Sequence, residues 1–128
     1  MRRDVLLVDF APNCRDEEAA GLPFVELDLS EPMPLREQFG YCIDVMEHIP
    51  PDQVETVIRN IMDSASTVFF QISTVDDRMG AMINRALHLS VCPHAWWRKK
   101  FESLGYFVSW QEMQDICSSF LVNKEIPA

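Results

Sequence analysis

Residues 39 to 50 read FGYCIDVMEHIP, an apolar run that stops at Asp44 and is followed by Glu47, His48 and paired prolines. The run is typical of a buried strand, and the prolines favour a helix start, because proline is compatible with the first helical turn. In open parallel α/β sheets the ligand crevice lies beyond the carboxyl ends of the strands. The order of these residues therefore predicts that Asp44, Glu47 and His48 face a bound ligand.

The surrounding segments alternate between strand and helix patterns. In chain order we expect a strand over 5–10, a helix over 15–20, strands over 24–29 and 39–45, a helix from 51, a strand over 67–72, helices over 81–89 and 94–104, and strands over 106–110 and 116–122 joined as an antiparallel hairpin. The runs over 5–10 and 67–72 are continuously apolar, which indicates burial on both faces.

The helix that starts near residue 51 has the clearest pattern. Its expected buried stripe consists of Val54, Val57, Ile58, Ile61 and Met62. The opposite, solvent-facing side is expected to carry Glu55, Arg59, Asn60 and Asp63. In the helix over 94–104, Trp97, Phe101 and Leu104 share one face, which favours core packing.

Composition limits the class of protein. A chain of 128 residues with 48% hydrophobic content is expected to form a single domain over 1–128. The net charge of -9 argues against nucleic acid as a partner, since phosphates are held by clustered Lys and Arg. No run is long enough for a signal or a membrane span, and the cysteines are scattered, so we expect a cytoplasmic protein with no membrane partner.

Four segments in this order resemble the class I S-adenosylmethionine-dependent methyltransferases of the small-molecule type. They are residues 7–12 (LVDFAP), 21–34 (GLPFVELDLSEPMP), 39–49 (FGYCIDVMEHI) and 88–97 (HLSVCPHAWW). The resemblance covers nearly all of the chain. It implies an α/β Rossmann-like methyltransferase fold, truncated at its N-terminus, with a mostly parallel sheet and a C-terminal antiparallel hairpin.

The resemblance also implies a cofactor, S-adenosylmethionine, and the residues that hold it. Asp9 matches the acid that accepts hydrogen bonds from the ribose hydroxyls, and Phe10 would lie beside the adenine. Asp28 matches the acid near the adenine amino group, with the backbone of Leu29 beside the ring edge. Asp44 and Met46 match the strand end beneath the methionine part.

Methyl transfer depends on positioning and, for a hydroxyl or amine acceptor, on a base. His48 is the candidate base, because a neutral imidazole accepts a proton near neutral pH; alternatively, it caps or packs against the following helix. Glu47 would orient His48, bind a divalent cation as in some quinone-pathway relatives, or serve a structural role. His88, Cys92 and His94 lie close in sequence, but Pro93 interrupts them and a fourth ligand is not evident, so no metal site is expected.

The chain departs from the family pattern at its start. The family's first strand and glycine-rich turn would precede Asp9, yet only eight residues do so here, and none of the four glycines lies in such a loop. By resemblance, the missing strand lies between the strands that end at Asp9 and at Asp44. Three alternatives follow: the strand over 5–10 slides into the gap, a second copy or another protein donates a strand, or the natural protein is longer.

Two functions remain open at this stage. The first is a methyltransferase-like protein that acts on a small acceptor and forms a homo-oligomer, or recruits a partner chain, to complete its sheet. The second is a catalytically inactive methyltransferase remnant that serves as a protein-binding or regulatory module. The absent loop favours the second, whereas Asp9, Asp28, Asp44 and the Glu47-His48 pair favour the first.

Overall fold

A computed structural model of the chain describes residues 5–9 and 21–126. Phe10 and the expected helix over 15–20 lie outside these residues. The described strands are β1 (Leu7–Asp9), β2 (Phe24–Glu26), β3 (Glu37–Ile43), β4 (Ala65–Ser73), β5 (Phe107–Met113) and β6 (Cys117–Asn123). The helices are α1 (Val54–Ser64), α2 (Arg78–Met82) and α3 (His94–Ser103), with short 3-10 helices η3 (Met46–His48) and η4 (Pro51–Gln53).

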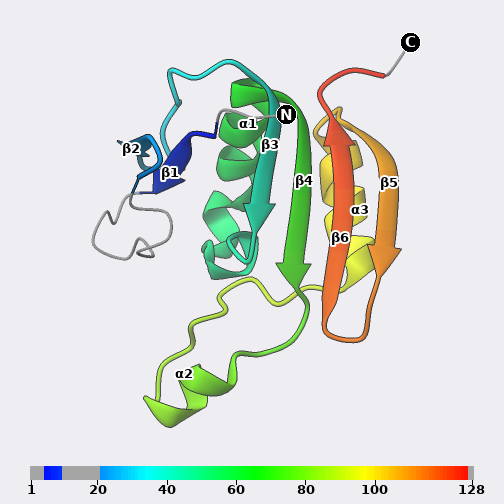
Figure 1. Cartoon of the computed structure of the whole chain (residues 1–128). Helices are drawn as coiled ribbons and strands as arrows, with labels where there is room; N and C mark the ends of the chain where they lie inside the picture. The colour runs from blue at the N-terminus through cyan, green and yellow to red at the C-terminus, as the bar shows by residue number, and fades with distance from the viewer. Residues whose placement is uncertain (1–4, 10–20, 127–128) are drawn as a thin grey trace.

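The strands form two separate sheets. The larger has the order β3-β4-β6-β5, in which β3 and β4 are parallel and β6 runs antiparallel to both of its neighbours. The smaller is the parallel pair β1-β2 (Figure 1). The predicted α/β class and the C-terminal antiparallel hairpin are confirmed.

The two sheets are not joined by strand pairing within the described residues. β1 is held to the β2 segment by backbone bonds from Leu7 to Pro23 and from Leu27 to Asp9, both 2.9 Å long. β3 forms an edge of the larger sheet. The alternative in which the strand over 5–10 slides to pair with β3 is therefore wrong, because β1 pairs with β2 instead. We refer to this absence of strand pairing between β1 and β3, within the described residues, as the gap between β1 and β3.

The core lies between the larger sheet and the two long helices, both of which lie behind that sheet in Figure 1. Phe101 of α3 packs against Phe70 of β4 and Phe120 of β6, with ring centroids 4.9 and 5.3 Å apart. The predicted stripe of α1 is buried as expected. Asn60 was expected at the surface and is instead buried, because its side chain donates to the carbonyl of Leu29 at 2.9 Å.

Three further local predictions need correction. The described part of the strand expected over 5–10 is not buried on both faces, since β1 lies in a two-stranded sheet. Instead of the helix expected over 81–89, the structure has α2. The side chain of Asp77 caps its start by accepting a hydrogen bond from the backbone N–H of Met79 at 2.8 Å. Asn84, with φ 54°, does not have helical backbone. The polar residues expected to join the hairpin strands extend β5 as far as Met113, with a bulge after Val108.

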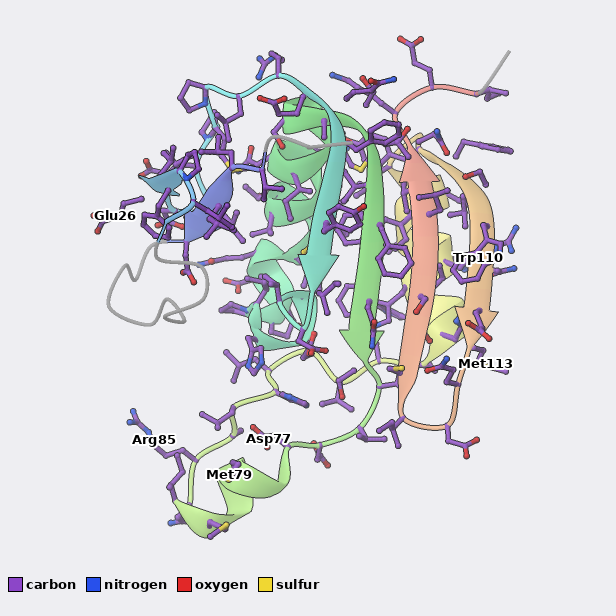
Figure 2. The ribbon with its side chains drawn as sticks, in the orientation of Figure 1. Glu26, Asp77, Met79, Arg85, Trp110 and Met113 are labelled. Atoms are coloured by element: carbon purple, nitrogen blue, oxygen red, sulfur yellow. The ribbon has the colours of Figure 1, made fainter. Side chains whose placement is uncertain are left out.

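The face of the larger sheet opposite the helices carries a row of aromatic side chains. Phe69 stacks on Trp110 with ring centroids 6.3 Å apart and meets Tyr41 edge-on at 6.5 Å. Tyr41 is 76% exposed and Trp110 is 46% exposed, and Figure 2 shows Trp110 on β5. Within the described residues no helix is long and apolar enough to cross a membrane.

Candidate functional site

The candidate site begins where β3 ends. The backbone N–H of Asp44 still donates to the carbonyl of Gln71 in β4 at 3.0 Å, so the residue is held at the tip of the parallel pair. Its φ of 57° turns the chain sharply, a conformation that Asp tolerates better than most residues. The chain then enters η3, which points Glu47 inward and leaves His48 exposed.

Glu47 is the most unusual side chain of the site. It is 1% exposed, and its Oε2 atom has no hydrogen-bond partner within the described part of the chain. Burial is the main reason that its pKa is raised; the nearby charge of Asp44 raises it further, and His48 and His88 oppose that effect. The free carboxylate oxygen thus lies in a site that disfavours its negative charge.

A distant segment of the chain closes over η3. The backbone N–H groups of Leu89 and Ser90 both donate to the carbonyl of Glu47, at 2.8 and 3.0 Å. The hydroxyl of Ser90 donates to the carbonyl of Ile49 at 2.6 Å. These three bonds bury Glu47 and bring His88 to the end of β3.

His48 and His88 form a pair whose rings meet edge-on, with centroids 4.9 Å apart. Nδ1 of His48 is 2.9 Å from the carbonyl oxygen of Leu87, and Nδ1 of His88 is 2.7 Å from that of Val75. A carbonyl only accepts hydrogen bonds, so each Nδ1 must carry the proton. In the neutral form of each ring, the lone pair is therefore on Nε2.

The residues expected to hold the adenosine lie on and after the β1-β2 pair. Asp9 is exposed at the carboxyl end of β1. Asp28 is exposed in the turn after β2, where the backbone and hydroxyl of Ser30 donate to its carboxylate at 2.9 and 2.7 Å and lower its pKa. Leu29 is half-buried, and Asn60 of α1 anchors its carbonyl.

Two residues near the end of β3 face the core. The side chain of Met46 is fully buried, so only its backbone is available to a ligand. Cys42 is also buried, and the loss of solvation, with a smaller contribution from Glu47, raises the pKa of its thiol to about 12. Cys42 is therefore a neutral core residue.

The structure brings Asp44, Glu47 and His48 to one place and adds His88, whose position beside His48 sequence reasoning missed. No local pattern predicts that contact, because the two histidines are far apart in the chain. His94 is engaged elsewhere: its ring nitrogens lie 2.8 Å from the Ser118 hydroxyl and from the Gln111 side-chain oxygen.

His88 also lines a cleft of about 370 Å³ beside α2. The cleft lies between Asp77, at the start of α2, and the returning segment that contains Arg85. Figure 2 shows these residues, with Met79, on a lobe that extends away from the larger sheet. A small molecule in this cleft would contact His88, one member of the His48–His88 pair.

Comparison with known proteins identifies the fold. LepI in complex with SAM matches with a TM-score of 0.70 and 12% identity, over 96% of this chain and 36% of that one. An O-methyltransferase family protein from Burkholderia thailandensis matches with a TM-score of 0.71 and 14% identity, over 94% of this chain and 43% of that one. DhpI in complex with SAH matches with a TM-score of 0.71 and 16% identity, over 94% of this chain and 65% of that one.

The chain therefore has the fold of the class I S-adenosylmethionine-dependent methyltransferases, as its sequence predicts. It spans less than two thirds of the length of each of these three neighbours. No protein-family model matches the sequence, and no curated protein matches it either.

Proposed function

We propose that this chain is an S-adenosylmethionine-dependent methyltransferase-like protein that acts on a small acceptor, with His48 as the general base. The observation that carries this proposal is the Glu47-His48 turn at the end of β3, where Nδ1–H of His48 is held by the carbonyl of Leu87. That bond leaves Nε2 as the atom that accepts a proton from a hydroxyl or amine acceptor. A carboxylate oxygen of Glu47 lies within 4.8 Å of a ring nitrogen of His48, close enough to help orient the imidazole.

The same proposal assigns the cofactor to the carboxyl ends of β1, β2 and β3. Asp9 would accept hydrogen bonds from the ribose hydroxyls, with Phe10 beside the adenine. Asp28 and the backbone of Leu29 would contact the adenine edge. Asp44 and the backbone of Met46 would lie beneath the methionine part. The Ser30 bonds keep Asp28 ionised, and the Asn60 bond holds Leu29 in place, which supports this arrangement.

Cofactor binding further requires that the gap between β1 and β3 be filled. We assign this role to one additional strand, donated by a second copy, by a partner chain, or by a longer form of the protein. An edge strand with free backbone groups is a template for such pairing. Tyr41, which is exposed on the same edge strand, adds an apolar side chain that a partner could cover.

Calorimetric titration with S-adenosylhomocysteine, combined with a mass measurement in solution, tests the proposal. We expect binding by an assembly larger than one chain. Asp9→Ala should weaken binding about tenfold or more, because charge-assisted hydrogen bonds are lost. Glu112→Ala is the matched control, since it removes an exposed acid on β5, at the opposite edge of the larger sheet from β3. An Asp9→Ala variant with unchanged affinity would contradict the assignment of Asp9.

The second candidate is a catalytically inactive remnant that serves as a protein-binding or regulatory module. The edge position of β3 in the described sheet favours it, because an edge strand can pair with a strand of another protein. Absence of S-adenosylhomocysteine binding at millimolar concentration, in an assembly of known mass, would support the remnant and end the enzyme proposal for this chain.

A further inference from the structure

We propose that Glu47, His48 and His88 form a binding site for one divalent transition-metal ion of the zinc type. The three side chains offer a carboxylate oxygen and two imidazole nitrogens that all lie within 4.8 Å of one another. Ligand atoms of a tetrahedral ion lie about 3.4 Å apart when the bonds are about 2.1 Å long. Binding an ion therefore requires these ligand atoms to move closer together than the 4.8 Å limit within which they lie.

One of the two carboxylate oxygens of Glu47, Oε2, lies in this site without a hydrogen-bond partner in the described part of the chain. Glu47 is 1% exposed. A buried polar atom in a native structure is normally paired, and a water molecule or an ion is one of the partners that such an atom can have. A cation beside His48 and His88 would be such a partner.

The histidines are oriented as metal ligands usually are. Each Nδ1–H donates to a backbone carbonyl, Leu87 for His48 and Val75 for His88. A hydrogen bond of this kind fixes the tautomer and orients the ring of a metal-bound histidine. Each Nε2 then carries the lone pair that would bind an ion, and the two rings lie close together, with centroids 4.9 Å apart.

The donor set identifies the class of ion. Two imidazoles and one carboxylate suit zinc and the neighbouring transition metals, whereas magnesium and calcium prefer sites made of oxygen atoms. Three protein ligands would leave a further coordination position, and His48 is exposed, so that position would be open to solvent. The acidic residue Asp44 and the net charge of -9 add attraction for a cation.

This inference does not rest on methyl transfer, because it requires neither the cofactor nor a completed sheet. It does bear on His48, since one Nε2 lone pair cannot bind an ion and accept a proton at the same time. S-adenosylhomocysteine binding and metal binding are separate measurements, so the failure of either proposal is visible without the other.

The test is a cobalt(II) titration of the chelator-treated protein, followed by visible absorption and by competition with zinc. We expect one ion per chain, displaced by zinc. Glu47→Gln, His48→Ala and His88→Ala should each weaken binding at least tenfold. His94→Gln is the matched control, because it removes the remaining histidine of the three in the chain and should leave the affinity unchanged.

A second readout does not depend on the folding of any variant. Long-range ¹⁵N–¹H spectra of the unmodified protein should show His48 and His88 as Nδ1–H tautomers, with both Nε2 resonances shifted by one equivalent of zinc. Absence of stoichiometric binding, equal weakening by His94→Gln, or a thiolate-to-cobalt absorption band from a cysteine site would each overturn the proposal.

Discussion

Replacing Glu47 by Gln should stabilise the metal-free protein at neutral and higher pH. Gln keeps the shape of Glu and removes its charge, so it relieves the burial of a carboxylate that is 1% exposed and has an unpaired Oε2. A buried polar group without a partner costs about 1–3 kcal/mol, and a charged one costs more. We therefore expect a gain of about 1–3 kcal/mol in unfolding free energy near pH 8, even though the amide remains buried.

The pH dependence gives this prediction its sign. Burial raises the pKa of Glu47, so the folded protein retains a proton that the unfolded chain releases above the ordinary value of 4.5. The associated stability is fully present below that value and is lost as the pH rises through the folded pKa. Near pH 4 the carboxyl is mostly neutral in both states, and the variant should differ little from the wild type.

Urea unfolding followed by circular dichroism, with a chelator present, measures the difference at both pH values. Comparing the variant with the wild type cancels the titration of the other groups. Glu112→Gln is the matched control, because Glu112 is exposed on β5 and its replacement should change stability little at either pH. The reasoning fails if the Glu47→Gln gain does not increase with pH, or if the variant is less stable than the wild type near pH 8.

Three further predictions follow from the packing. Phe101→Ala should cost about 3–5 kcal/mol of unfolding free energy by chemical denaturation, because the ring is fully buried between α3 and the sheet, whereas Phe107→Ala, at a residue 40% exposed, should cost far less. Asn60→Ala should cost about 1 kcal/mol in the same assay, since the carbonyl of Leu29 loses its donor; no loss would show that water replaces the bond. Cys42 should resist alkylation near pH 8 in the folded protein, because burial raises its pKa to about 12, and mass spectrometry of native and urea-treated samples checks this.

Much of the fold follows from patterns within short segments. The apolar runs placed β3, β4 and β6 to within a few residues, because strand residues that pack into a core must be apolar in sequence. The stripe of α1 identified the face that it buries. Gly105, with φ 90°, ends α3 where a left-handed residue is needed.

Other elements depended on contacts that no local pattern carries. The sequence pattern places Asn60 on the polar side of α1. In the structure the segment after β2 packs there, and the carbonyl of Leu29 accepts a hydrogen bond from the Asn60 side chain. The helix expected over 81–89 begins earlier, because the cap at Asp77 outweighs the apolar residues that follow. The incomplete burial of β1 reflects its two-stranded sheet, which its own continuous apolar run did not indicate.

The candidate site likewise has some features that follow from local sequence and others that depend on distant contacts. A strand that ends in an acid, followed by Glu47 and His48, could be read directly from the residues, because strand ends and helix starts are marked by neighbours in the chain. The burial of Glu47 and the position of His88 could not, because both arise from hydrogen bonds between η3 and residues 87–90, some 40 positions further along. Chain periodicity specifies which face of an element is buried; it does not specify which distant segment covers that face.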